Sequence, residues 1–577
     1  MEFNIELSKD GYKIVKVSLH GKTQYIGSKY NEENEINKFL HSYEPYGIND
    51  NYIVFGLCCG EHIKKLLEKI GPKSKVLIIE VNKNLIKYWE MSQELKAIFI
   101  DPRIIIAKEK EDIYKFFNNY ITEINVNNIK VGFYSRYENI YKDELKEVYE
   151  SIRNEVTRIT SNRNIKLHYG EVWFDLLLKN LPYISKGIPV NDLKNQYKDV
   201  PAIIVSAGPS LNKNIHELHN VKSSLILSGG RTLRALMERN IKLDFICAVD
   251  PLEESYKLVQ GYIDKAKCPL VFYEGTNDKI VREHKKEKIF STNSEFINKV
   301  YKKHIQSLSS GGSVAHSMTL LAAYMGCSPI IFVGQDLAYT GEQGHAKCAE
   351  DSFRKVTFED YKKTDDIYVK DINGNEVRTS ITLNRFRVAL ENIISLFPNI
   401  KFINATEGGV SIRGAENKNL KEVVNEIERE REERNLLKPL PKKEDDKTEE
   451  LLLQLKKVVR DLKEYMKAYS ERESVVLRFK NQLDRIPIDL TYEEIDYIKT
   501  MDYKLEKIID SLDIIKDWIF KVYYKYEILE ELNILSSDDF KEAARKNFIK
   551  NNRIFCEVKE LVENAIDKIN KAIDNIK

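Results

Sequence analysis

We expect a doubly wound, Rossmann-like α/β domain at the centre of this chain, a smaller α/β domain before it and an α-helical bundle after it. Short runs of β-branched and aromatic residues recur between residues 190 and 416. Such runs are typical of strands buried on both faces of a parallel sheet. Each run passes into polar or glycine-rich residues, as strands do before a loop. After Gly414 glycine disappears and charge rises, which predicts helices.

The composition indicates a large protein without a nucleic-acid signature. The chain has 577 residues, of which 42% are hydrophobic and 31% charged. Lys and Arg number 91 against 89 Asp and Glu, so no excess of positive charge points to nucleic acid. The acidic start is no signal peptide, and no apolar run approaches a membrane span. The seven cysteines lack metal-ligand spacing, so we expect a reduced, cytoplasmic compartment.

The first domain is expected over residues 1–142. An antiparallel unit comes first, and the segment Tyr52–Glu80 then has the outline of a nucleotide-binding βαβ unit, with Glu80 placed to hold a ribose hydroxyl. The loop Gly56–Gly60 lacks the full glycine fingerprint, and its two cysteines are bulky for a phosphate loop. A structural Rossmann-like domain is therefore preferred, with nucleotide binding as the alternative. A helical connector is expected over 143–189.

The central domain, residues 190–416, opens with the segment on which the functional argument rests. Pro201–Val205 predicts a buried strand, Ser206–Gly208 a tight turn, and Pro209 suits a first helical turn, where its missing N–H costs nothing. Free N–H groups at a helix start attract anions. The segment therefore indicates phosphate binding, and a plain strand–helix turn is the alternative.

Further strands are expected along the central domain, and their carboxyl ends predict a cleft. The runs are Ser224–Ser228, Phe245–Val249, Pro269–Tyr273, Pro329–Val333 and Lys401–Asn404. In open α/β sheets, ligands bind where such strands end. The residues expected to border one cleft are Ser210, Arg231, Asp250, Thr276, Asn277 and Asp336. For any one of them, turn formation or helix capping is the alternative.

Two features separate the last strands from the others. The polar segment Tyr339–Asp365 predicts a long loop, which is usually functional or mobile. The dipeptide Asn373–Gly374 predicts a hairpin between Asp366–Lys370 and Glu376–Thr379.

Residues 420–577 are expected to form a helical bundle. Thr491–Glu494 fits a capping box for one long helix, and another is expected from Phe540. A heptad pattern precedes them at Leu451, Leu455, Val458, Leu462, Tyr465 and Tyr469. The high charge of this part predicts a solvated surface, and partner docking is the alternative.

Four motifs carry a resemblance to a known family. They are Ala202–Leu211, Gly311–Ala315, Ile331–Thr340 with the nearby Gly344–Ala346, and Asn404–Gly409. In this order they resemble the motifs of the bacterial motility accessory factor (Maf) flagellin glycosyltransferases. The same domain resembles 6-hydroxymethylpterin diphosphokinase-like proteins and, more distantly, bacterial sialyltransferases that use CMP-sugars.

The resemblance implies transfer of a nonulosonic acid (pseudaminic, legionaminic or sialic-type) from its CMP-activated form to Ser or Thr of flagellin, for filament assembly and motility. No metal is required, and Mg²⁺ is optional. The partners are then flagellin and the CMP-sugar donor, and a homo-oligomer is left open. From the strand ends and the family motifs together, we expect the donor-binding residues to be Ser206, Gly208, Pro209, Ser210, Arg231, Asp250, Thr276, Asn277, Ser310, Gly311, Gly312, Ser313, Gln335, Tyr339, Asn404 and Thr406.

The same resemblance implies a base that deprotonates the acceptor hydroxyl. A histidine suits this role near neutral pH. His345 lies near the family's Gly-His-Ala and is expected to be the base, with Asp336 orienting it or the sugar and Glu407 as a rival base. His316 falls inside an apolar helix and is expected to be a packed residue.

Two other functions are weighed. An ATP- and Mg²⁺-dependent pterin diphosphokinase would use carboxylates such as Asp250 and Asp336 to hold metal against phosphates. Such a small-molecule kinase would need neither the first domain nor the helical tail. A non-catalytic flagellin-binding chaperone would use the helical domain. The glycosyltransferase is preferred.

Overall fold

The computed structural model of the protein describes residues 2–19, 21–93, 95–308, 312–340, 343–350, 366–430, 440, 446–483 and 491–577. The chain forms two compact units, each made of segments that are separated in sequence. Unit 1 comprises Met1–Gly170, Tyr465–Ile508 and Lys516–Glu563, and unit 2 comprises Glu171–Glu464, Ile509–Ile515 and Asn564–Lys577. The boundaries expected at 142, 189 and 416 stay a prediction.

Unit 1 begins with two sheets. Strands β1 (Glu2–Leu7), β2 (Lys13–Leu19) and β3 (Lys22–Ile26) pair antiparallel. Strands β4 (Asn51–Phe55), β5 (Lys75–Ile79), β6 (Ile104–Ala107) and β7 (Ile129–Phe133) form a parallel sheet in the order β6-β5-β4-β7. Both the antiparallel unit and the Rossmann-like sheet are as the sequence predicts.

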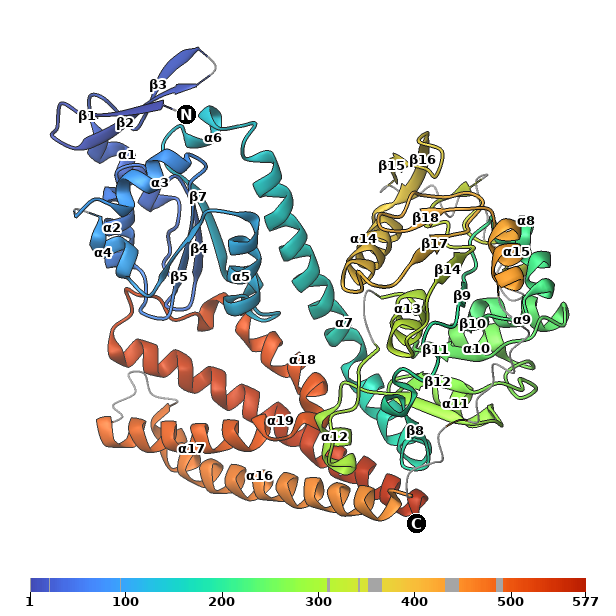
Figure 1. The fold of residues 1–577 in the computed structure, drawn as a ribbon. Helices are drawn as coiled ribbons and strands as arrows, with labels where there is room; N and C mark the ends of the chain where they lie inside the picture. The colour runs from blue at the N-terminus through green and yellow to red at the C-terminus, as the bar shows by residue number, and fades with distance from the viewer. Residues whose placement is uncertain are drawn as a thin grey trace. The chain divides into compact units, whose positions relative to one another are not determined.

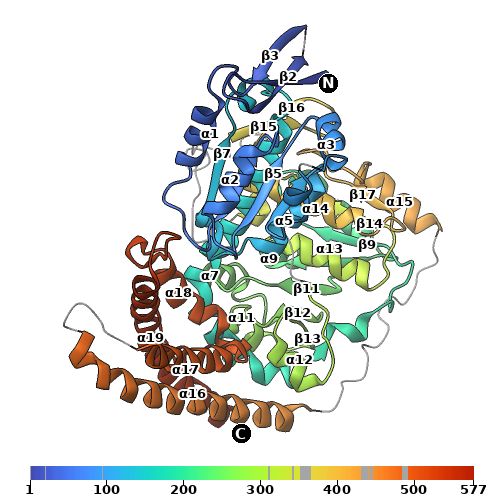
Figure 2. The ribbon, with the colours of Figure 1, turned by 90° about the vertical axis from the view of Figure 1, so that its left-hand side faces the viewer.

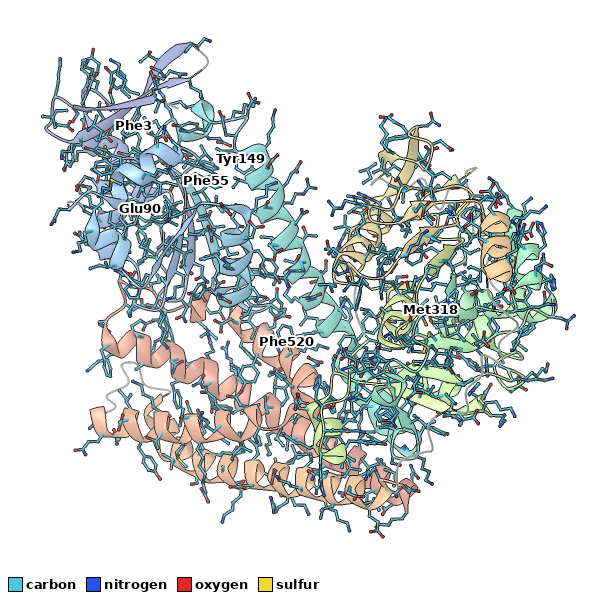
Figure 3. The ribbon with its side chains drawn as sticks, in the orientation of Figure 1. Phe3, Phe55, Glu90, Tyr149, Met318 and Phe520 are labelled. Carbon is cyan, nitrogen blue, oxygen red and sulfur yellow. The ribbon has the colours of Figure 1, made fainter. Side chains whose placement is uncertain are left out.

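Helices surround the parallel sheet of unit 1. They are α1 (Glu32–His41), α2 (Glu61–Lys69), α3 (Lys83–Glu90), α4 (Lys96–Ile100), α5 (Lys110–Tyr120) and α6 (Tyr137–Ile140). The core includes a stack of Phe55 on Phe133, with ring centroids 4.6 Å apart. Tyr149 of the long helix α7 (Lys146–Ile184) meets the Phe55 ring edge-on at 5.5 Å, and Figure 3 labels both residues.

Unit 2 is built on one parallel sheet of nine strands. The strand order is β18-β17-β14-β9-β10-β11-β12-β13-β8, and every neighbouring pair is parallel. The strands are β8 (Ile188–Pro189), β9 (Ala202–Val205), β10 (Leu225–Gly229), β11 (Phe245–Ala248), β12 (Leu270–Tyr273), β13 (Lys288–Ser291), β14 (Ile330–Val333), β17 (Phe402–Asn404) and β18 (Glu416–Asn417). The expected doubly wound sheet is confirmed, and β8, β13 and β18 add to the predicted strands.

Helices cover both faces of this sheet (Figure 1). On one face, Ile203 and Val205 of β9 share a buried core with α8 (Leu211–Asn214), α9 (Gly230–Glu238) and α15 (Leu420–Glu430). On the other lie α13 (Val314–Tyr324), whose Met318 is fully buried, and α14 (Ile381–Ser395). The shorter helices of this unit are α10 (Glu253–Val259), α11 (Asp278–Glu283) and α12 (Glu295–Tyr301).

A hairpin lies between β14 and α14 in the chain. Strands β15 (Asp366–Lys370) and β16 (Glu376–Ser380) pair antiparallel. Gly374 has a φ of +85°, which glycine adopts without strain, so the predicted turn is confirmed. Of the loop expected over Tyr339–Asp365, residues 341, 342 and 351–365 lie outside the described residues.

The C-terminal part is helical, as predicted (Figure 2). It contains α16 (Thr448–Leu483), α17 (Tyr492–Asp510), α18 (Lys516–Glu527) and α19 (Phe540–Ile576). The predicted capping box is present, because the Thr491 N–H donates to Glu494 and the Glu494 N–H donates to the Thr491 hydroxyl. The heptad positions are buried except Val458, where Val459 is buried instead. Within the described ranges, no helix is both long and apolar enough to cross a membrane.

Candidate active site

The site expected from the sequence lies at the carboxyl edge of the unit 2 sheet. From β9 the chain proceeds to β10, β11, β12 and β13 on one side, whereas β14 and β17 lie on the other. The strand order therefore reverses between β9 and β14, and open α/β sheets bind ligands at such a reversal. The loops after β9, β14 and β17 begin at Ser206, Gly334 and Ala405.

Asp336 joins these loops. Its side chain is 1% exposed and accepts three hydrogen bonds: from the Ser210 hydroxyl at 2.6 Å, the Ser210 N–H at 3.1 Å and the Thr340 hydroxyl at 2.9 Å. Burial raises the pKa of Asp336, and these donors oppose that rise by stabilising the carboxylate. Asp336 thus fixes the relative positions of the loops after β9 and β14.

The loop after β9 differs from the expected phosphate cradle. Helix α8 has only four residues, and the Ser210 hydroxyl and N–H both bind Asp336. The Gly208 N–H donates to the Gly334 carbonyl at 2.7 Å, and a Cβ added at Gly208 would lie 2.1 Å from Asp336 Oδ1. Pro209 is buried beside them. The donors expected to hold phosphate are thus used within the protein, whereas the buried Ser206 hydroxyl has no partner among the described residues.

The loop after β17 interlocks with Asp336 through its backbone. Gly409 has a φ of +76°, and a Cβ there would lie 2.2 Å from the Asp336 carbonyl oxygen. That oxygen accepts the Val410 N–H at 2.8 Å. The Thr406 hydroxyl accepts the Gln335 N–H at 3.1 Å, and the Asn404 side chain accepts the Thr406 N–H at 3.2 Å. The three loops therefore form one polar assembly.

Glu407, the rival base, lies at the edge of this assembly. It is half-buried, and its Oε1 accepts the side-chain amides of Asn214 at 3.3 Å and Asn419 at 3.2 Å. Its carbonyl accepts the Lys213 ammonium at 2.7 Å. These contacts hold the carboxylate between α8 and the start of α15.

His345 lies beside the loop after β9. It is half-buried, and the N–H of its neighbour Ala346 donates to the Ala207 carbonyl at 2.9 Å. His316 is fully buried and donates its Nε2–H to the Phe386 carbonyl at 2.9 Å, which confirms that it is a packed residue.

Tyr339 is held by the β15–β16 hairpin. Its N–H donates to the Arg378 carbonyl at 3.0 Å, and the Arg378 guanidinium lies 4.6 Å from the centre of its ring. The Thr379 hydroxyl donates to the Leu337 carbonyl at 2.7 Å. The hairpin therefore holds the backbone of Leu337 and Tyr339, just after Asp336.

Asp250, Thr276 and Asn277 form a second group at the ends of β11 and β12. The buried Thr276 hydroxyl donates to the Ala248 carbonyl at 2.9 Å, and the Asn277 N–H donates to the Asp250 carbonyl at 3.0 Å. Asp250 is exposed, and its carboxylate accepts the Leu252 N–H at 2.8 Å. Turn formation, the alternative reading, thus accounts for these contacts.

Of the remaining predicted donor residues, Arg231 follows β10, which lies between the strands of the two groups. Arg231 is half-buried in the first turn of α9. Ser313 caps α13, accepting the Ala315 N–H at 3.3 Å, and Gly312 has a φ of +78°. Ser310 and Gly311 lie outside the described residues.

The structure separates the predicted cleft residues along the sheet edge. Neighbouring strands lie about 4.8 Å apart, so the ends of β14 and β12, four places apart, are separated by about 19 Å. Asp336 and Thr276 therefore cannot contact one phosphate together, although an extended ligand can reach both groups.

One residue of this edge was missed in the sequence. Glu274 follows β12, is 7% exposed, and accepts the Asn293 N–H at 3.1 Å through Oε1, while Oε2 has no partner in the described structure. Burial raises its pKa to about 7. Asn180 of α7 donates to the Glu274 and Thr276 carbonyls. The signal was present, because Glu274 directly follows the predicted strand Pro269–Tyr273.

In unit 1, Glu80 follows β5 as Glu274 follows β12, and its carboxylate accepts hydrogen bonds from within the protein. Glu80 accepts the Leu57 N–H at 3.1 Å, the Asn82 N–H at 2.9 Å and the Tyr137 hydroxyl at 3.0 Å. A Cβ added at Gly56 would lie 2.8 Å from the Tyr137 ring. Glu80 and the loop at Gly56 are therefore bonded and packed within the protein, and the structural role of this domain stays the preferred prediction.

Part of this chain matches a known protein family, and the whole chain aligns with a solved structure. Residues 175–342 match the family described as 6-hydroxymethylpterin diphosphokinase MptE-like. The solved structure of a MAf glycosyltransferase from Magnetospirillum magneticum AMB-1 aligns with a TM-score of 0.60 and 14% sequence identity, over 100% of this chain and 93% of that one. A search of curated proteins finds no match. The comparisons confirm the fold that the resemblance implied.

Proposed function

We propose that this protein is a glycosyltransferase that transfers a nonulosonic acid from its CMP-activated form to Ser or Thr hydroxyls of flagellin. The observation that carries the proposal is the fold shared over the full length of the chain with a MAf glycosyltransferase. The helical parts and the N-terminal domain are included in that similarity, and a small-molecule kinase would need neither.

The geometry of the sheet edge suits an extended donor. The predicted donor residues run from the end of β17 to the end of β12, with Arg231 between them. A nucleotide joined to a sugar would lie along more of such an edge than one phosphate could. Arg231 would neutralise part of the charge of the departing CMP.

In the proposed sugar transfer, a metal ion is optional. The sugar develops positive charge at its anomeric carbon and carries its own carboxylate, and CMP is a good leaving group. The protein would then need to steady the phosphate and to take the proton of the acceptor hydroxyl. His345 and Glu407 flank the strand-order reversal and are both half-buried, which supports the proposal that one of them acts as this base. Asp336 would act as a positioning residue that keeps neighbouring side chains in place, since its oxygens already accept hydrogen bonds from Ser210 and Thr340.

A pterin diphosphokinase is the second candidate, because the matched family over 175–342 carries that description. Its metal would need neighbouring carboxylates. Asp250 and Asp336 follow strands three places apart, or about 14 Å at the usual strand spacing. Over the described residues, no group of three or more His, Cys, Asp or Glu is arranged to hold a metal ion.

Ligand-induced stabilisation separates the two candidates. We expect CMP and CTP to raise the thermal unfolding midpoint, and ATP or GTP not to. A ligand at a hundred times its Kd adds about 2.7 kcal/mol to the free energy of unfolding. Arg231→Ala should reduce the CMP effect, whereas Arg239→Ala, at the other end of α9 and bonded to its own helix, should keep it. Stabilisation by ATP with Mg²⁺ alone would favour the diphosphokinase.

A further inference from the structure

Residues 343–350, here called the His345 segment, pack against the face of the unit 2 sheet that carries α9. Two of its alanines, Ala346 and Ala349, are buried. They belong to the same core as Ala235 and Leu236 of α9. A stretch that the sequence predicts to be part of a long loop therefore has a defined place on a helix.

The backbone of the His345 segment is bonded on both sides of the histidine. Before His345, the Gln343 N–H donates to the Thr340 carbonyl at 3.3 Å, in the loop after β14. After it, the Ala346 N–H donates to the Ala207 carbonyl at 2.9 Å, in the loop after β9. The backbone at His345 is thus held between the two loops at which the strand order reverses.

Arg234 of α9 binds the end of the His345 segment. Its Nη2 donates to the Glu350 carbonyl at 2.6 Å. Nearby, the Cys348 N–H donates to the Asn212 side chain at 3.4 Å. A guanidinium donor makes a charge-assisted hydrogen bond, which is stronger than one between neutral groups. Arg234 therefore supplies the strongest type of side-chain contact described for this segment.

Helix α9 also carries Arg231, which we propose to neutralise charge on the departing CMP. Arg231 and Arg234 are three positions apart, or about 4.5 Å along the helix, so they lie on one face of α9. One helix thus connects the expected phosphate contact with the segment of the expected base. Misplacing a reacting group by about 1 Å can lower a rate about 10²-fold. A loose His345 segment would therefore slow proton transfer.

We propose that Arg234 is a positioning residue for sugar transfer, and that it acts by holding His345 at the distance that proton transfer requires. Arg234 binds the Glu350 carbonyl, so its effect on the reaction passes through the His345 segment. This inference rests on the proposed function, with His345 as the base, and adds to it the residue that keeps the base in place.

Steady-state kinetics of the full-length protein, with a CMP-activated nonulosonic acid and flagellin, test this role. Arg234→Met keeps an unbranched apolar side chain but removes the hydrogen-bond donors. We expect kcat to fall about tenfold, whereas the KM for the CMP-sugar and the thermal stabilisation by CMP stay unchanged. Arg234→Lys keeps a charged donor and should recover most of the lost kcat.

Two further comparisons separate positioning from other effects. Arg239→Met makes the same substitution on α9, where the guanidinium bonds the Ala235 carbonyl of its own helix at 3.0 Å, and should keep kcat unchanged. In a His345→Ala background, Arg234→Met should cause no further fall, because a residue that acts through His345 has no effect once the imidazole is gone.

Each contrary result has its own meaning. Unchanged kcat in Arg234→Met, with an active wild type, would contradict this inference and leave the proposed function intact. A further tenfold fall in the His345→Ala background would show that Arg234 acts independently of His345. A raised KM for the CMP-sugar would place Arg234 in donor binding, and a lower unfolding midpoint in both Arg234 variants would make its role structural. A wild type that transfers no sugar would contradict the proposed function, and this inference with it.

Discussion

The Ser210 hydroxyl donates a 2.6 Å hydrogen bond to the Asp336 carboxylate, across 126 residues of chain. This bond joins the loop after β9 to the loop after β14, where the strand order of the unit 2 sheet reverses. Because the Ser210 N–H binds the same carboxylate, Asp336 organises the candidate active site from within the protein.

Removal of the Ser210 hydroxyl should destabilise unit 2. In Ser210→Ala, the buried Asp336 carboxylate loses its shortest hydrogen bond, and we expect the free energy of unfolding to fall by about 1–3 kcal/mol. Chemical denaturation measures this. Ser395→Ala is the matched control, because that exposed hydroxyl bonds only a carbonyl of its own helix, and its effect should stay within about 0.5 kcal/mol. Equal effects would show that Ser210 does not support Asp336.

Gly409→Ala should cost more stability than Gly374→Ala. Both glycines have positive φ, +76° and +85°, so alanine is strained by about 1–2 kcal/mol at either. A Cβ at Gly409 would also meet the Asp336 backbone at 2.2 Å, whereas nothing lies within 4 Å of one at Gly374. Thermal unfolding of the two variants isolates this contact. Similar midpoints would mean that the loop after β17 can shift away from Asp336.

These contacts show what the sequence could and could not predict. Strand patterns located the ends of β9 and β14, so Ser210 and Asp336 were both expected at the cleft. That they bind one another was not foreseeable, because periodicity does not reveal the hydrogen-bond partners of side chains so far apart in the chain. The expected phosphate cradle required free N–H groups at the start of α8, but the Ser210 N–H binds Asp336.

The acidic residues at strand ends give a similar lesson. Glu80 was expected at the end of a strand and lies there, but Tyr137, 57 residues later, occupies the space above its loop. Glu274 also directly follows a strand, but it was not predicted as a site residue. The positions of such residues follow from local pattern, whereas the direction of their side chains depends on distant packing.

Glu274 should make stability depend on pH. Its folded pKa of about 7 lies above the ordinary value of 4.5 because of burial. The folded state therefore holds this proton more tightly, so the stabilisation is complete below pH 4.5 and is lost as the pH rises through 7. Glu274→Gln lacks this titration.

From pH 4.5 to 8, the stability of the wild type relative to Glu274→Gln should fall by up to about 3 kcal/mol. Denaturation at both pH values measures the difference. Glu80→Gln should behave alike in unit 1, since burial also raises the pKa of Glu80 to about 7. A difference that is constant with pH would show that the pKa of Glu274 is the same in the folded and unfolded states.

The identity of the base can be tested with two variants. His345→Ala should lower the rate of sugar transfer by about 10²- to 10⁴-fold while CMP still binds, because only the proton acceptor is lost. Transfer is measured as CMP release that depends on the acceptor protein. If only Glu407→Gln loses sugar transfer, Glu407 is the base. Full activity in both variants would exclude both residues as the base.

The central proposal is tested most directly by the mass of the acceptor protein. Purified protein is mixed with a CMP-activated nonulosonic acid and unglycosylated flagellin, and intact flagellin is weighed by mass spectrometry. We expect mass increments of whole sugar residues, with one CMP released for each. Unchanged flagellin, together with AMP formation from ATP and 6-hydroxymethylpterin by the same preparation, would contradict the glycosyltransferase and establish the diphosphokinase.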